Sequence, residues 1–491
     1  MNKHLRFLPL FLIIFAFFFV WFTIVHPAVL YDTDDWSQGS LVRSFLPVWH
    51  GWNPIKVLPE TLYPLVIQVA GLLIYPFTGN FSLSITLLSA LTISLFITIY
   101  FIFSFRVVSK IVPSTTTNYL FTFSLFFLLH FVFFITNSTN KSKYFFWSID
   151  LLCYYHYLIP ALINCAFISL FLLRDNKTND LNYSSLGILC ASLYLSIFSN
   201  VLHSAVLQIY ISLAITTEFW IYRKSSKKII VFFKQKWIFI ASLSLWLISL
   251  LFESQGGRAV SIGKSFDFFQ ISKTLAVFLS TVKSTNYCIF FSTCSVILVG
   301  FLCVFLKDSY QNYRKVFTNI FLTLLFYFIY LVLVCSKAGS WYIGRTDVTF
   351  GLFFLYCMLF SLSLLILMNE IKSLNFFLGP TIVTLVAFSI LSKPHFFSSV
   401  MDYESEASAI QITNNIVEQI ITADALNIDP VYLSVPASAR KDNWPFGTYA
   451  HRSFSNLLLK QHIIKNSHRV IMKPSEEMSS RHGLVIRKHN K

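Results

Sequence analysis

Charged residues are scarce in this chain of 491 residues. They make up 12% of the sequence, with only 22 acidic side chains, whereas a soluble domain averages about 25% charged residues. Hydrophobic residues reach 55%, Phe alone occurs 54 times, and the mean hydropathy is +0.65. An ordinary soluble domain is thereby excluded. Because apolar stretches of about 18 or more residues cross bilayers as helices, we expect a polytopic α-helical membrane protein.

Several common motifs are also absent. No C-x-x-C pair occurs, so neither a disulfide framework nor a zinc site is implied. We find no G-x-G-x-x-G or P-loop pattern, which argues against a nucleotide-binding fold, and no internal repeat of the transporter type. The eight cysteines lie in or beside apolar segments and are expected to be small fillers of the membrane core: Cys153, Cys165, Cys190, Cys288, Cys294, Cys303, Cys335 and Cys357.

Long apolar runs are abundant. The first lacks the cleavage site of a signal peptide, so we expect it to remain as an anchor. Residues 61–77 are apolar but interrupted by Pro64 and Gln68, and we expect them to lie on the membrane surface. We predict about eleven transmembrane helices, at residues 7–25, 83–105, 118–136, 149–172, 183–200, 203–221, 237–251, 287–306, 316–335, 348–368 and 374–392.

The net charge of +16 is unevenly distributed. With the N-terminus inside, the predicted cytoplasmic pieces hold 16 Lys and Arg in 57 residues, and the opposite loops hold 10 in 118. Such asymmetry is typical of the positive-inside rule and argues against a nucleic-acid partner. We therefore expect a multi-pass membrane protein, in contact with membrane lipid, with a cytoplasmic N-terminus and a C-terminus on the opposite side of the membrane.

The amino-acid composition changes after residue 392. Residues 393–491 contain 12 Lys and Arg, nine acids and no cysteine. Helical spacing in "EASAIQITNNIVEQIITADAL" and "SFSNLLLKQHII", with strand-like "VYLSV" and "HRVIMK", predicts a small α/β domain. The chain thus divides into a membrane domain at 1–392, with a first outer loop at 26–82, and an α/β domain on the outer side at 393–491.

The stretch "VLYDTDDWSQGS" follows the first apolar run and concentrates three carboxylates, Asp32, Asp34 and Asp35. A partly buried carboxylate beside a second one has a raised pKa and suits a general base. Paired carboxylates also suit a divalent cation such as magnesium or manganese, although the metal is optional here. The structural alternative is a helix N-cap with solvated loop charge.

Further polar and aromatic residues fall on the same predicted face. Aromatic rings beside few charges are typical of a carbohydrate and phosphate site, in which Arg binds phosphate in a bidentate manner. Each candidate also has a structural alternative: Arg345 can snorkel at the interface, His203 can be a packed or capping histidine, and Arg258 can pair with Glu253. The candidates for binding sugar or acceptor are Asp32, Trp36, Glu60 and His203, and those for donor phosphate are Lys56, Arg258 and Arg345.

The order of these features resembles the GT-C glycosyltransferases. A first span, an outer loop opening with an Asp motif, a membrane-lying helix, many further spans and a C-terminal outer domain match that architecture over the whole chain. The phrase "WNPIKVLPETLYPLVIQVAGLLIYPFTG" is similar to the serotype-converting O-antigen glucosyltransferases, a likeness limited to about residues 31–82. The resemblance implies that Asp34 or Asp35 acts as catalytic base and that basic residues of the outer loops contact the donor phosphate. Relatives often carry Arg where this chain has Lys56, and Lys lacks bidentate geometry.

What the resemblance implies is transfer of a hexose, with glucose the first candidate, from undecaprenyl phosphate to a lipid-linked or lipopolysaccharide glycan. It also implies a bacterial inner membrane, with the outer loops and the C-terminal domain in the periplasm. An O-antigen polymerase or ligase is the nearest alternative, but its largest loop would be expected between late spans. A flippase or other transporter would place ionisable residues in mid-span, where this chain has almost none.

Overall fold

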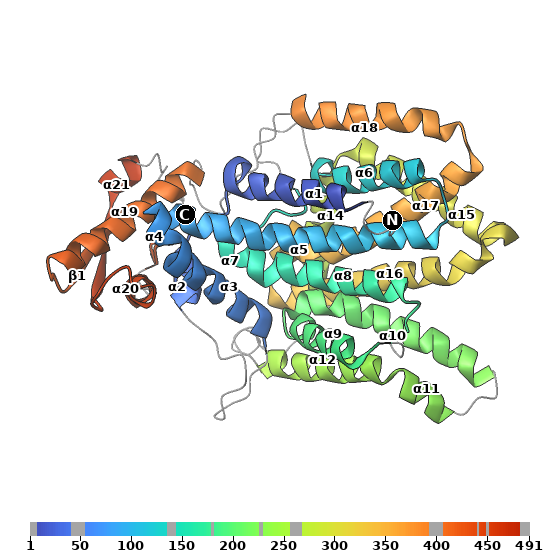
Figure 1. Ribbon diagram of the computed structural model, residues 1–491, viewed down its shortest axis with the longest axis horizontal. Coiled ribbons are helices and arrows are strands. Elements are labelled where there is room, and N and C mark those ends of the chain that lie inside the picture. The colour runs from blue at the N-terminus through green and yellow to red at the C-terminus, as the bar shows by residue number, and fades with distance from the viewer. Residues whose placement is uncertain are drawn as a thin grey trace.

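The computed structural model describes residues 7–40, 55–134, 144–177, 181–224, 229–255, 268–391, 406–438, 441–447 and 451–481. Helices dominate these residues (Figure 1). Up to residue 255 the helices, with π-helical turns η2, η3 and η4, are α1 (Leu8–Val20), η2 (Trp21–Val25), α2 (Thr33–Ser40), α3 (Val57–Val69), η3 (Ala70–Ile74), α4 (Tyr75–Thr78), α5 (Phe81–Ile111), α6 (Thr116–Val132), α7 (Leu151–Cys153), η4 (Tyr154–Leu158), α8 (Ile159–Leu173), α9 (Tyr183–Ile197), α10 (Val201–Lys224), α11 (Ile229–Gln235) and α12 (Trp237–Gln255).

The remaining elements include two 3-10 turns and two strands. In chain order they are α14 (Phe268–Lys283), α15 (Tyr287–Leu306), η5 (Asp308–Tyr313), α16 (Arg314–Ala338), η6 (Ser340–Gly344), α17 (Thr346–Glu370), α18 (Leu374–Leu391), α19 (Glu406–Ala425), β1 (Val431–Pro436), α20 (His451–Lys460), β2 (Val470–Ser475) and α21 (Glu476–Arg481).

Within the described part of the chain, nine helices are long and apolar enough to cross a membrane, and three shorter apolar helices accompany them. Every segment predicted as a span falls on one of these helices, so their helical nature is confirmed. The chain is thus a helical protein with the length and apolarity of a polytopic membrane protein.

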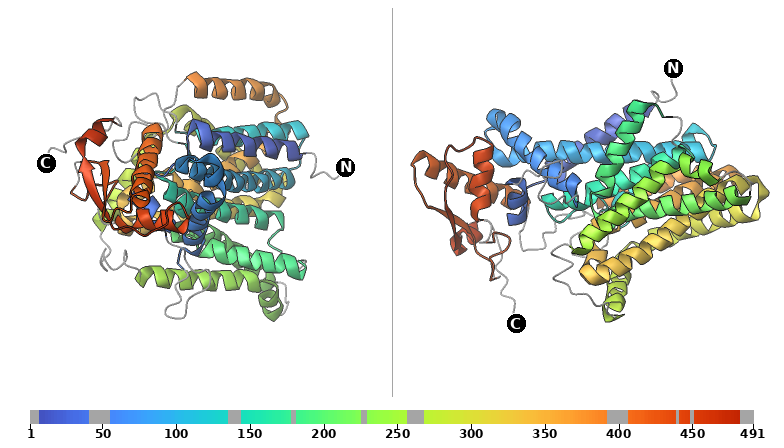
Figure 2. Two further views of the ribbon diagram at one scale, coloured as in Figure 1. Left: turned by 60° about the vertical axis from the view of Figure 1, so that its left-hand side comes forward. Right: turned by 90° about the horizontal axis from the view of Figure 1, so that it is seen from below.

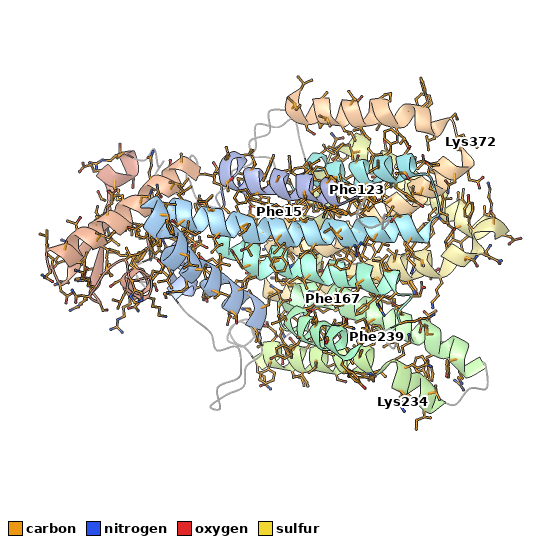
Figure 3. The ribbon with its side chains drawn as sticks, viewed as in Figure 1. Phe15, Phe123, Phe167, Lys234, Phe239 and Lys372 are labelled. Atoms are coloured by element: carbon orange, nitrogen blue, oxygen red, sulfur yellow. The ribbon has the colours of Figure 1, made fainter. Side chains whose placement is uncertain are left out.

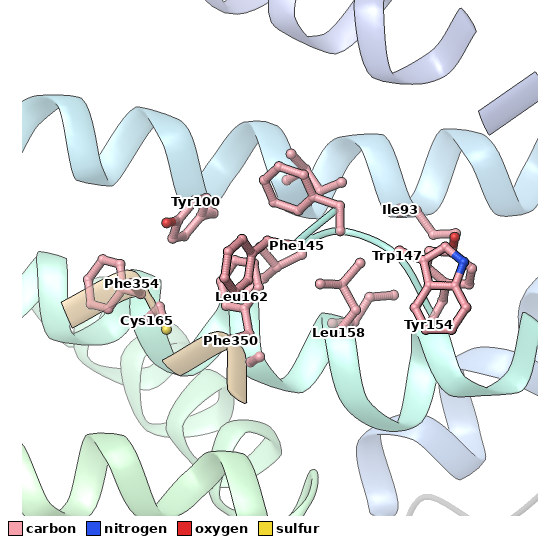
Figure 4. Packing of buried hydrophobic residues seen from close by; sticks show 14 of the residues in the cluster. Ile93, Tyr100, Phe145, Trp147, Tyr154, Leu158, Leu162, Cys165, Phe350 and Phe354 are labelled. Carbon is pink, nitrogen blue, oxygen red and sulfur yellow. The ribbon is translucent and has the colours of Figure 1, made fainter. Parts of the chain in front are cut away.

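The long helices lie side by side in one bundle (Figure 1). The 31-residue α5 packs against α1 and α8, and α17 packs against α6, α15 and α16. Of the candidate spans α17 is the most enclosed, because 94% of its 18-residue apolar stretch is buried. Phe and Tyr side chains fill the space between α5, α8 and α17, as the packing around Tyr100, Leu162 and Phe350 illustrates (Figure 4). Side chains of this size bury large apolar areas and dominate the packing energy of such a core.

Residues 57–78 form one helix built from α3, η3 and α4. Its length and hydropathy are sufficient for a span, yet its α3 portion runs obliquely to α5 across one end of the bundle (Figure 1). That it lies on the membrane surface stays a prediction.

The C-terminal segment, defined here as residues 406–481, lies at the same end of the bundle (Figure 2). Strands β1 and β2 pair in parallel, with Val431 opposite Val470, and α19 packs on β1. The predicted strands and helices of this segment are confirmed as elements. Lys234 and Lys372, from two of the predicted cytoplasmic pieces, lie at the opposite end of the bundle (Figure 3).

Candidate functional site

Five segments that are distant in sequence meet at the end of the bundle that carries the C-terminal segment. They are residues 26–40, 144–158, 200–203, 339–347 and 445–447, and the contacts described below join them. Two of the π-helical turns, η2 and η4, border this region. Because π-helical turns occur frequently at functional sites, and because most of the predicted site residues lie here, we treat this region as the candidate site.

Asp32 caps the N-terminus of the acidic helix α2. Its Oδ1 accepts hydrogen bonds from the backbone N–H groups of Asp34 and Asp35, at 2.9 and 3.1 Å. Its side chain is buried, and burial together with the neighbouring carboxyls of Asp35 and Asp150 raises its pKa well above the ordinary value. The structural alternative considered for the triplet, an N-cap, is therefore confirmed for this residue.

Asp35 connects α2 to the rest of the site. Its carboxylate accepts hydrogen bonds from the backbone N–H groups of Tyr31 and Leu152, each at 2.7 Å, and more weakly from that of Asp32. The residue is fully buried, and burial, with the charge of Asp150, raises its pKa despite these hydrogen bonds. A carboxylate so engaged with the backbone is suited to holding α2 in place.

Asp34 differs from both neighbours because its side chain is exposed. It stands in the first turn of α2, where a carboxylate is stabilised by the helix dipole. Of the three aspartates, Asp34 is the one that a substrate can reach from solvent.

Asp150 was not singled out from the sequence, yet it belongs to the same cluster. It is the N-cap of α7, accepting from the backbone N–H of Cys153 at 2.6 Å, and burial raises its pKa. The segment "WSID" before an apolar run is a helix-start signal that could have identified it.

A narrow crevice opens beside Asp150, with a water-accessible volume of about 20 Å³. His26 lines this crevice, and its Nδ1 is hydrogen-bonded to the Tyr144 hydroxyl at 2.6 Å; that hydroxyl accepts a hydrogen bond from Trp21 Nε1 at 2.9 Å. The crevice is lined by residues from the chain after η2 and from around α7, namely His26, Pro27, Ala28, Val29, Tyr31, Trp147, Ser148, Ile149, Asp150, Leu151 and Tyr154.

Arg345 and Asp347 form a buried ion pair. Arg345 Nε and Nη2 donate to the two carboxylate oxygens of Asp347 at 2.9 and 2.6 Å, and Ser148 Oγ donates to Oδ2 at 3.2 Å. The guanidinium lies over the ring of Tyr157, 4.3 Å from its centroid. Arg345 is therefore held rigidly with its charge balanced, which fits a structural pair better than snorkelling and weakens it as a free phosphate clamp.

His203 lies next to this pair, at the N-terminal end of α10. It is fully buried, with its ring 6.1 Å from that of Tyr157, and neither ring nitrogen has a hydrogen-bond partner among the residues that the structure describes. The burial of His203 fits the packed histidine of the structural alternative, although an unsatisfied buried imidazole costs about 1–3 kcal/mol. A sugar-binding role for His203 stays a prediction.

The other predicted residues lie as follows. Trp36 is 1% exposed, stacked on Phe81 and 4.7 Å from Phe454, so it packs the acidic helix and has no face open to a sugar; that prediction is corrected. Lys56 occupies the N-cap position of α3 in a left-handed conformation, with no capping hydrogen bond from its side chain. Glu60 is in the first turn of the same helix, and both residues are half-buried. Arg258 lies outside the described residues.

The described part of the chain contains no preformed metal site, because no group of three or more His, Cys, Asp or Glu side chains there is placed to hold an ion. The divalent cation stays an expectation.

Comparison with known proteins does not assign a family, because no family model, no curated protein and no solved structure matches this chain.

Proposed function

We propose that the protein is a membrane glycosyltransferase that moves a hexose, with glucose the first candidate, from undecaprenyl phosphate to a periplasmic glycan acceptor such as O-antigen. The observation that carries this proposal is the position of Asp34. It is an exposed carboxylate on a short helix, next in sequence to the buried carboxyls of Asp32 and Asp35. An accessible base at the end of an apolar bundle suits a substrate whose tail is lipid and whose reacting group is polar.

The proposed topology gives this end access to lipid-linked sugar. Eleven of the apolar helices cross the inner membrane, helix 57–78 lies on its periplasmic surface, and residues 393–491 form a small periplasmic α/β domain. The basic loops at the other end of the bundle, where Lys234 and Lys372 lie (Figure 3), support this orientation.

In the proposed reaction, the hydroxyl oxygen of the acceptor attacks the anomeric carbon of the hexose, and Asp34 accepts the proton of that hydroxyl. The bond from that carbon to the phosphate oxygen breaks, and undecaprenyl phosphate leaves with the electron pair. A cationic side chain stabilises the leaving phosphate. Lys56 and Arg258 are the candidates for this role, because the charge of Arg345 is already balanced by Asp347.

In this proposal, His203 and the neighbouring Arg345–Asp347 ion pair orient the substrate. The imidazole hydrogen-bonds a sugar hydroxyl, which satisfies a group that the described residues leave without a partner.

The test is transfer of labelled hexose by the purified protein in lipid nanodiscs, from undecaprenyl-phosphate hexoses to an O-antigen acceptor. Because general-base catalysis contributes about 10²- to 10⁴-fold, Asp34→Asn should lower kcat by that factor without loss of folding. Asp308→Asn is the matched control, since Asp308 is a 98% exposed carboxylate in the turn before α16.

The results test the role of Asp34 and the transferase activity separately. Full activity in Asp34→Asn would remove the base assignment. Absence of transfer with every undecaprenyl-phosphate hexose, combined with movement of the intact lipid-linked sugar between leaflets, would instead identify a flippase.

A further inference from the structure

The acidic helix α2 is too weak to hold its own conformation. It has eight residues, and its sequence TDDWSQGS contains a glycine and two serines. Isolated helices shorter than about 12–15 residues are marginal even in Ala-rich sequences, and Gly and Ser lower helix stability further. The conformation that places Asp34 must therefore come from tertiary contacts.

One set of contacts comes from the membrane bundle. The Tyr63 hydroxyl donates to the backbone carbonyl of Asp35 at 2.9 Å, and the Asp35 carboxylate accepts from the backbone of Leu152. Gly39 packs against Ile67 and Tyr63 of α3, where an added Cβ would be in ordinary van der Waals contact with Ile67 at 3.4 Å. These contacts fix one side of α2.

The C-terminal segment provides the other set, and it reaches the start, middle and end of α2. At the start, the Thr33 N–H donates to the Pro445 carbonyl at 2.9 Å, the Thr33 hydroxyl donates to the same carbonyl, and the Gly447 N–H donates to the Thr33 hydroxyl at 2.8 Å.

At the middle of α2, the ring of Phe454 lies 4.7 Å from that of Trp36, which also stacks on Phe81 of α5. At the end, Lys460 Nζ donates to the backbone carbonyl of Ser40. That carbonyl belongs to the last turn of the helix, where the backbone has no partner within the helix and a cation is favourable.

We propose that the C-terminal segment is a positioning element for the acidic helix, and that its contacts through Pro445, Gly447, Phe454 and Lys460 set the placement of Asp34. The proposal rests on the proposed function only for the role of Asp34; the holding of α2 is independent of it. Thr33 is the main positioning residue, because its backbone and side chain make three hydrogen bonds to residues 445–447.

The test compares Thr33→Val with Thr33→Ser in the full-length protein in nanodiscs. Valine keeps the shape and removes the hydroxyl, whereas serine keeps the hydroxyl. Thr323→Val is the matched control: Thr323 is equally buried, and its hydroxyl donates only within its own helix. Hydrogen–deuterium exchange of the amides of residues 33–40 reports the stability of α2 without any substrate.

We expect Thr33→Val to exchange these amides at least about tenfold faster, and Thr33→Ser and Thr323→Val to exchange them as the wild type does. In the transfer assay, Thr33→Val should lower kcat at unchanged KM, with recovery in Thr33→Ser. Equal protection of α2 in Thr33→Val and Thr323→Val would overturn the holding role, and faster exchange with unchanged kcat would overturn the positioning of Asp34. Should the wild type transfer no hexose, the exchange result still decides whether the segment holds α2, and only the proposed function fails.

Discussion

Asp32, Asp34 and Asp35 occupy four consecutive positions with Thr33, but their carboxylates have different environments. Asp32 caps α2, Asp35 bridges to α7, and Asp34 is exposed. Successive residues of a helix point about 100° apart, so the direction of each side chain depends on which face of α2 meets the bundle. The sequence could identify the triplet as the candidate site. It could not assign the three roles, because that face is set by contacts with α3, α7 and the C-terminal segment.

The raised pKa of Asp32 leads to a pH-dependent stability. Between the ordinary pKa of 3.8 and the raised folded-state pKa, the folded protein keeps a proton that the unfolded chain releases. The free energy of unfolding therefore falls as the pH rises through this window, by about 1.4 kcal/mol per unit for each such group. Asp32→Asn should keep the cap, because Asn is an equally good N-cap residue, and remove this dependence.

We therefore expect Asp32→Asn to raise the thermal unfolding midpoint relative to the wild type at pH 7–8, and to lose this advantage towards pH 4. Thermal unfolding in detergent across pH 4–8 measures the difference. A difference between the two proteins that stays constant with pH would contradict the buried state of this carboxyl.

Among the elements, the apolar helices could be predicted from hydrophobic runs because membrane spans are defined by length and composition. The π-helical turns at Trp21–Val25, Ala70–Ile74 and Tyr154–Leu158 could not, because a single inserted residue leaves no compositional signal. Which helices pack against one another could not be predicted either, because lipid-facing and helix-facing positions are both apolar.

Close helix packing gives a prediction at this scale. A Cβ on Gly300 of α15 would lie 2.3 Å from the Ser363 Cβ and 2.8 Å from its Cα, so α15 and α17 would have to separate. We expect Gly300→Ala to destabilise the protein by about 1–3 kcal/mol, as overpacking does. Gly187→Ala in α9 is the control, because a Cβ added there would have no neighbouring atom within 4 Å and alanine favours a helix.

Thermal unfolding of the two variants in the same detergent measures this effect. Equal midpoints for Gly300→Ala and Gly187→Ala would show that α15 and α17 do not cross closely at Gly300.

For the whole molecule, the sequence predicted a helical membrane part followed by a segment of mixed helices and strands, and the basic loops predicted its orientation. It did not predict that the C-terminal segment packs on α2. Contacts such as Thr33 with Pro445 join residues about 400 positions apart, and neither partner carries a local pattern that indicates the other.

The central claim is that the end of the molecule carrying α2 and the C-terminal segment faces the periplasm. Thiol labelling in intact cells tests it most directly, in a protein whose eight native cysteines have been replaced. Leu426→Cys reports on the C-terminal segment, where Leu426 is 64% exposed, and Asp308→Cys reports on the turn before α16. The account predicts that a membrane-impermeant maleimide labels Leu426→Cys in intact cells and Asp308→Cys only after permeabilisation. The reverse pattern would place Asp34 in the cytoplasm, away from lipid-linked sugar, and would contradict the account.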